Sequence, residues 1–192
     1  LALGNGGNRM NWNPTTDGRV IWITGLSGAG KSTLAHATAE CLRENGERPV
    51  LIDGDDIREA VADPHIGHDP ASRLANAYRI SRLAKLFAEQ GHTVIVATMS
   101  LFHEIHDWNR LNLPGYFEVW IEVDMTTLQS RDARGLYSRA ANQIAPDVAG
   151  IDLAYEKPKA PHWVIHNNAD QDGLTIQAER ILNQLNPELI KL

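Results

Sequence analysis

The stretch VIWITGLSGAGKST, residues 20–33, joins an apolar run directly to a glycine-rich motif. Residues 25–32 match the pattern G-x-x-x-x-G-K-[S/T] in full, after a strand candidate and before a helix candidate. In this pattern the glycines let backbone N–H groups turn toward a phosphate, and the helix N-terminus adds partial positive charge. The alternative, a flexible glycine turn with an exposed lysine, does not explain the complete motif. The sequence therefore predicts a phosphate-binding loop, the P-loop, inside an α/β fold.

The P-loop residues have individual expected roles in binding ATP. Lys31 should contact the β- and γ-phosphates, and the Ser32 hydroxyl should be a ligand of Mg²⁺. ATP and Mg²⁺ are therefore the expected cofactors. The ATP-binding residues predicted in this loop are Gly25, Ser27, Gly28, Ala29, Gly30, Lys31, Ser32 and Thr33.

Short apolar runs alternate with longer amphipathic ones along the chain, which is typical of a parallel sheet covered by helices. Strands are expected at 20–24, 50–52, 93–97, 117–121 and 163–165, and helices at 31–45, 56–62, 71–90, 126–131 and 174–185. The predicted fold is an α/β three-layer sandwich: a parallel β-sheet with helices on both faces.

The segment 132–161 has three prolines and weak periodicity, so it is interpreted as long and mobile. One P-loop domain is expected over 18–190, and a lid at about 132–150 is implied by the family resemblance described below. Residues 1–9 lack the charged start and apolar middle of a signal peptide. We therefore interpret residues 1–10 as a tag or disordered tail.

Composition excludes several classes of partner. The 192 residues carry a net charge of −6, which disfavours nucleic acid and anionic membranes because both attract basic surfaces. The chain has one cysteine and no apolar run of about 18 residues that could span a bilayer. A cytoplasmic protein with a small charged ligand is expected, and a homodimer stays open.

A second cluster of charged residues, DGDDIR at 53–58, follows the second strand candidate. Asp53 and Asp55 alternate along what is expected to be an extended segment, so their carboxylates should point the same way. One can hold Mg²⁺ through water, and the other can accept the proton of an attacking hydroxyl, while Arg58 clamps a phosphate. The alternative is an acidic turn that caps a helix beginning at Asp56. Next to a P-loop, the cluster favours a phosphotransferase with a hydroxyl acceptor.

These motifs together resemble the adenylyl-sulfate kinase family over about residues 20–167. The similar segments are IWITGLSGAGKST (21–33), DGDDIR (53–58), RLANAYRI (73–80), AKLFAEQG (84–91), RDARGLY (131–137) and GIDLAYEKP (150–158). The family transfers the ATP γ-phosphate to the ribose 3′-hydroxyl of adenylyl sulfate, using Mg²⁺. The resemblance implies a lid over ATP from Arg131 to Ala149.

The resemblance also implies roles for individual side chains. Asp55 is the expected base or metal-water ligand, and it forms the catalytic set with Lys31 and Arg58. Arg131 is expected at the ATP. The predicted acceptor-binding residues are Asp53, Asp55, Arg58, His68, Arg73, Asn76, Met99, Ser100, Leu101, Arg134 and Val148.

Departures from the family pattern cluster around the acceptor. The usual ISPFR is MSLFH at 99–103, DLGF is HIGH at 65–68, and FTGI is VAGI at 148–151. In the family, two phenylalanines stack on the acceptor adenine, and His68 and Val148 stand at their positions here. The donor side is kept while the acceptor pocket is rebuilt.

Kinases of capsule-polysaccharide pathways that phosphorylate cytidine diphosphoramidate fit this pattern, and the run ATMSLFHEI at 97–105 is similar to that branch. A pyrimidine needs less aromatic surface than adenine, so this acceptor is favoured. Adenylyl sulfate is the alternative acceptor, in sulfate assimilation. An ATP-binding regulator without catalysis is the rival from another class, against which the intact Ser32, Asp53 and Asp55 argue. Gluconate- or shikimate-type kinases are disfavoured by the RDARGLY and DGDDIR motifs.

Overall fold

The computed structural model describes residues 18–62, 67, 69–132, 135–142, 148–168 and 173–185. The predicted tail at 1–10 and part of the predicted lid lie outside these residues. A five-stranded sheet forms the centre, in the order β2-β3-β1-β4-β5, and every neighbouring pair is parallel. The strands are β1 (Arg19–Gly25), β2 (Val50–Asp53), β3 (Thr93–Thr98), β4 (Phe117–Glu122) and β5 (Trp163–His166). Their carboxyl ends therefore meet at one edge, where open α/β sheets bind ligands.

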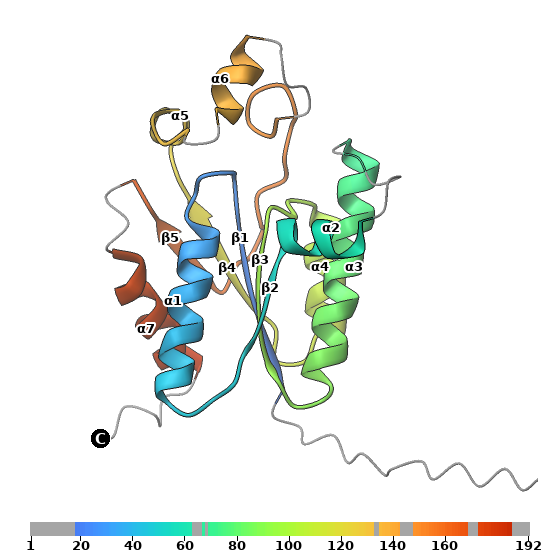
Figure 1. Cartoon of the computed structure of the whole chain (residues 1–192), viewed down its shortest axis with the longest axis vertical. Coiled ribbons are helices and arrows are strands. Elements are labelled where there is room, and N and C mark those ends of the chain that lie inside the picture. Colours follow the sequence, from blue (N-terminus) through green and yellow to red (C-terminus); the bar gives the residue numbers. More distant parts are fainter. Residues whose placement is uncertain are drawn as a thin grey trace, which may run out of the picture.

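Helices cover both faces of the sheet (Figure 1). One face carries α1 (Lys31–Glu44) and α7 (Gly173–Leu185), and the other carries α2 (Gly54–Val61), α3 (Pro70–Ala88) and α4 (His103–Asn112). Two short helices, α5 (Met125–Ser130) and α6 (Leu136–Ala141), lie beyond the carboxyl edge. The predicted three-layer sandwich is confirmed.

Strand β1 divides the apolar core between these two faces. Ile21 and Ile23 belong to the cluster under α1 and α7, while Val20 and Trp22 belong to the cluster under α3 and α4. All four side chains are fully buried. A strand covered on both faces reads as a continuous apolar run, because successive side chains point to opposite sides. This is why polar and apolar residues do not alternate along β1, which leads directly into the P-loop.

The predicted strands and helices are all present, but the structure adds two helices that the sequence analysis did not predict. Helix α4 begins after Phe102, which offers no side-chain cap, and α6 has six residues within the segment interpreted as mobile. Neither helix has a local start signal strong enough to be recognised. Single-domain organisation over 18–190 and lid mobility stay predictions.

The prediction that Asp53 and Asp55 lie on one extended segment is wrong. Strand β2 ends at Asp53 and α2 begins at Gly54, which places Asp55 in the first helical turn. The Asp53 carboxylate accepts a hydrogen bond from the Asp55 N–H and so caps α2. The helix-capping alternative is thus realised, but the helix begins at Gly54, two residues before Asp56, with Asp53 as its cap. Aspartate is favoured there because it satisfies an unpaired N–H at a helix start.

None of the helices in the described part of the chain is long and apolar enough to cross a membrane.

Candidate functional site

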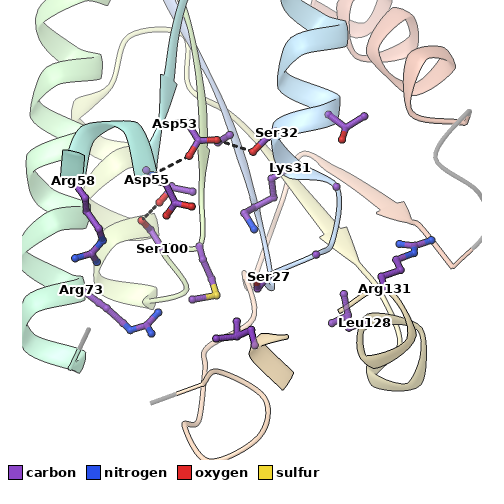
Figure 2. A pocket seen from close by; sticks show the side chains of 18 of the residues that line it. Ser27, Lys31, Ser32, Asp53, Asp55, Arg58, Arg73, Ser100, Leu128 and Arg131 are labelled. Carbon is purple, nitrogen blue, oxygen red and sulfur yellow. Dashed lines mark hydrogen bonds between the residues drawn. The ribbon is translucent and has the colours of Figure 1, made fainter. Parts of the chain in front are cut away.

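A cavity of about 470 Å³ opens at the carboxyl edge of the sheet (Figure 2). The P-loop forms its centre, α2 and α3 form one wall, and the segment through α5 and α6 forms the other. Figure 2 shows Arg58 and Arg73 on one side of Lys31 and Arg131 on the opposite side. The lining residues are Ser27, Gly28, Gly30, Lys31, Ser32, Thr33, Asp53, Gly54, Asp55, Arg58, Arg73, Asn76, Ala97, Thr98, Met99, Ser100, Leu128, Arg131, Asp132, Leu136 and Tyr137.

The P-loop is braced from outside by two distant side chains. The Tyr137 hydroxyl donates to the Ser27 carbonyl oxygen at 2.7 Å, and Asn167 Nδ2 donates to the Ala29 carbonyl oxygen at 2.9 Å. Both side chains are buried. Because these carbonyls are already bonded to protein, the loop can present N–H groups to a phosphate without leaving buried polar atoms unpaired.

Gly30 is required by both conformation and space. Its φ of 102° is left-handed, and a Cβ there would lie 2.8 Å from Leu174 and 3.0 Å from Asn167. Larger residues would therefore push α7 and the Asn167 brace away from the loop. Lys31, the next residue, donates from Nζ to the Leu26 carbonyl oxygen at 2.8 Å.

An oxygen-rich group lies between the P-loop and α2. The Ser32 hydroxyl donates to Asp53 Oδ2 at 2.7 Å, and the Asp55 N–H donates to Asp53 Oδ1 at 2.9 Å. A serine hydroxyl next to aspartate carboxylates provides the hard oxygen donors that Mg²⁺ prefers, often through water. The residues present therefore fit the expected metal.

The wall opposite α5 is polar and positively charged. Arg58 Nη1 donates to the Gly67 carbonyl oxygen at 2.9 Å, which holds this guanidinium at the cavity rim. Thr98 Oγ1 and Ser100 Oγ lie 3.0 Å apart at the end of β3, and the largely buried Asn76 of α3 lines the same cavity. Arginine, amide and hydroxyl groups together can bind the phosphate and sugar of a nucleotide.

The wall through α6 is organised by Asp132. Its carboxylate accepts from the Ser138 hydroxyl and from the N–H groups of Tyr137 and Ser138, which cap α6. The Ser138 hydrogen bonds, foremost the one from its hydroxyl, lower the pKa of Asp132. Burial raises the pKa of Tyr137 to about 12, with the Asp132 charge adding to the effect. Tyr137 is therefore a neutral hydrogen-bond donor at neutral pH.

Comparison with known proteins matches this geometry to one family. The family described as adenylylsulphate kinase matches residues 17–166. The chain belongs to the adenylylsulphate kinase family. It is an ATP-using kinase, as the family members are.

Two relatives illustrate the range of acceptors in the family. Cytidine diphosphoramidate kinase of Campylobacter jejuni is 38% identical to this kinase, over 86% of this chain and 95% of that protein. Adenylyl-sulfate kinase of Bacillus velezensis is 43% identical, over 76% of this chain and 75% of that protein. The structure of the Mycobacterium tuberculosis APS kinase CysC in complex with AMPPNP and APS has a TM-score of 0.81 and 30% identity, covering 88% of this chain and 98% of that one.

Some predicted site residues of the kinase lie outside the cavity lining. Gly25 ends β1 against Ile121, and Ala29 is buried with its N–H donating to Leu26. Leu101 and Val148 are buried in the apolar core, so they support the wall from behind. His68 and Arg134 lie outside the described residues. The other predicted residues line the cavity together.

Eight lining or bracing residues of the kinase were not predicted as site residues: Gly54, Ala97, Thr98, Leu128, Asp132, Leu136, Tyr137 and Asn167. Tyr137 lies in the RDARGLY motif, so its side chain could have been included from that signal. Thr98 lies in the run at 97–105, whereas Leu128 lines the cavity from a position with no motif of its own. Asn167 follows β5 and reaches the P-loop across 138 positions of sequence. No local pattern predicts such a contact.

Proposed function

We propose that this kinase transfers the γ-phosphate of Mg-ATP to a ribose 3′-hydroxyl of a nucleotide, with cytidine diphosphoramidate as the favoured acceptor. The observation that supports it is that one cavity is lined both by the P-loop and by the polar residues of α2, α3 and the end of β3. The P-loop lies at its centre, and Asp55, Arg58, Arg73 and Ser100 line the cavity on one side of it. In-line transfer needs the donor phosphate and the acceptor hydroxyl to meet in one enclosed space.

In this proposal the described residues divide the chemistry among them. Lys31 and the P-loop N–H groups hold the β- and γ-phosphates and stabilise the charge of the transferring group. Asp55 accepts the proton of the attacking hydroxyl, and Arg58 neutralises charge on the acceptor side. The wall through Arg131 and Tyr137 covers ATP and excludes water that would compete with the acceptor.

Ser32 and Asp53 would hold Mg²⁺, with Asp53 and Asp55 acting through water. When bound, the metal neutralises charge on the β- and γ-phosphate oxygens. Asp53 also caps α2, so the same carboxylate positions Asp55 relative to the P-loop.

The acceptor assignment rests on the altered pocket residues and on the extent of similarity. Val148 replaces an expected aromatic residue and is buried in the core, so it offers no ring for an adenine to stack on. Similarity to the cytidine diphosphoramidate kinase extends over 95% of that protein, whereas similarity to the B. velezensis adenylyl-sulfate kinase covers 75%. Adenylyl sulfate remains the second candidate, supported by the higher identity of 43%.

The test is a direct competition between acceptors. Purified kinase with Mg-ATP is offered cytidine diphosphoramidate and adenylyl sulfate separately, and kcat/KM is measured for each by ADP release and product mass. We expect kcat/KM to favour the cytidine compound by about tenfold or more, the magnitude of one stacking or charge contact of about 1–3 kcal/mol. A preference for adenylyl sulfate would reverse the acceptor assignment. Phosphorylation of neither compound would favour an ATP-binding regulator.

A further inference from the structure

His106 is a buried histidine of α4 that the proposed chemistry does not use. Its side chain is 3% exposed, and Nε2 lies 2.8 Å from the carbonyl oxygen of Ser100. Ser100 lines the cavity at the end of β3 and is itself buried. The histidine thus contacts the backbone of a residue that also lines the cavity.

Only one orientation of the proton fits this contact. A carbonyl oxygen accepts hydrogen bonds, so Nε2 must carry the proton and donate it to Ser100. Nδ1 has no hydrogen-bond partner among the described residues, and Glu118 Oε1 lies 3.5 Å from it. Burial lowers the pKa of His106, while Glu118 acts in the opposite direction. The imidazole is therefore neutral at neutral pH, with its one proton on Nε2.

The loop between β3 and α4 is attached to the rest of the protein at several points. Thr98 Oγ1 lies 3.0 Å from Ser100 Oγ, and the N–H of Glu156 donates to the Leu101 carbonyl oxygen at 3.2 Å. Two hydrogen bonds hold the peptide unit between Ser100 and Leu101: one joins His106 Nε2 to the Ser100 carbonyl oxygen, and the other runs from the Leu101 N–H to the Met99 carbonyl oxygen at 2.8 Å. Ser100 exposes its hydroxyl to the cavity only if this peptide keeps its orientation.

Glu118 lies on the Nδ1 side of the histidine, with Oε1 3.5 Å from Nδ1. It is fully buried in β4 and forms an ion pair with Arg110 at 2.7 Å, also from α4. This ion pair links β4 to α4 next to the imidazole. Through its hydrogen bond to Ser100, the histidine can therefore fix the position of the loop between β3 and α4 relative to the sheet.

We propose that His106 is a positioning residue for the nucleotide acceptor, acting through the Ser100 carbonyl on the wall formed by Met99 and Ser100. The inference rests on the proposed function, in which that wall contacts the acceptor. It assigns no direct contact between the histidine and either substrate.

The test compares two substitutions of His106, one that removes the hydrogen bond to the Ser100 carbonyl oxygen and one that keeps a donor for it. His106→Phe keeps a ring but removes the donor, whereas His106→Gln keeps an N–H that extends about as far as Nε2. Asn109→Leu is the control, since Asn109 is also buried in α4, about one turn away. kcat and KM are measured for ATP and for whichever nucleotide the wild type phosphorylates, and melting temperatures report folding.

We expect His106→Phe to raise the acceptor KM by about five- to tenfold, the effect of one lost hydrogen bond, with the ATP KM changed by less than about twofold. His106→Gln should restore most of the acceptor KM, and Asn109→Leu should leave it near the wild-type value. Equal changes in both KM values, or the same acceptor effect in Asn109→Leu, would show a purely structural role and overturn the proposal.

A second measurement needs no acceptor and no stable Phe variant. In ¹⁵N-histidine NMR spectra of the wild type, one histidine should show a slowly exchanging Nε2 proton that is absent from His106→Gln. An Nδ1-protonated tautomer at this position would overturn the proposal. This readout also separates the two hypotheses: if neither nucleotide is phosphorylated, the proposed function fails while the His106–Ser100 contact is still tested.

Discussion

At the scale of single residues, the site depends on atoms that are placed before any ligand arrives. Lys31 lies between the two walls of the cavity, and Ser32 is already hydrogen-bonded to Asp53. Such preorganisation matters because a charge that is fixed in advance costs no reorganisation when the transition state forms. Lys31 is the residue from which the largest single effect is expected.

Lys31→Ala should lower kcat by about 10²–10³, the range found when one preorganised donor to a developing charge is removed. Steady-state kinetics with Mg-ATP checks this value. Lys85→Ala is the control, because Lys85 lies on α3 and pairs with Glu89 at 3.6 Å, away from the cavity. Near-normal turnover in Lys31→Ala would contradict the role assigned to the lysine.

At the scale of elements, α6 is held by contacts rather than by its own propensity. The helix has six residues, too short to be stable alone, and its start depends on the Asp132 carboxylate. Its link to the P-loop is the hydrogen bond from the Tyr137 hydroxyl to the Ser27 carbonyl. The wall through α6 and the P-loop are therefore expected to move as one unit.

Tyr137→Phe should raise the ATP KM by about fivefold through loss of this one hydrogen bond, while the acceptor KM stays near its wild-type value. Parallel titrations of the two substrates measure the split. Tyr155→Phe provides the control, since Tyr155 packs against the same apolar cluster. An unchanged ATP KM in Tyr137→Phe would mean that the P-loop keeps its shape without the tether.

At the scale of the whole molecule, the sheet order brings distant segments of the chain to the P-loop. Strand β1 is central, between β3 and β4, so its loop receives α2 from one side and the end of β5 from the other. Asn167, just after β5, completes this arrangement through the Ala29 carbonyl. Stability and ATP binding should therefore be coupled through Asn167.

Asn167→Ala should lower the free energy of unfolding by about 1–3 kcal/mol, because the buried Ala29 carbonyl loses its partner. Urea unfolding, with and without Mg-ATP, measures the effect. Asn45→Ala is the matched control: Asn45 also donates to a carbonyl, that of Cys41 at 2.8 Å, but is exposed, so water can replace it. Equal destabilisation by the two substitutions would refute the buried brace.

The sequence alone determined the P-loop, the parallel α/β sandwich and the positions of its main strands and helices. Local sequence patterns predict these features: the glycine spacing of residues 25–32, the apolar run of β1 and the glycines that follow α1 and α3. Asp53, Asp55 and Arg58 were also found, because one short motif carries all three.

Only the tertiary structure decided how the cavity is braced and walled. The contacts from Tyr137 to Ser27 and from Asn167 to Ala29 span 110 and 138 positions. They depend on strand order and helix packing, which no short window of sequence encodes. Neither α4 nor α6 has an N-cap residue whose side chain caps the helix, and the Asp132 contacts that start α6 became visible only in the structure. Nothing in the local sequence distinguishes His106 from other helix residues, and only the fold shows that its imidazole contacts Ser100.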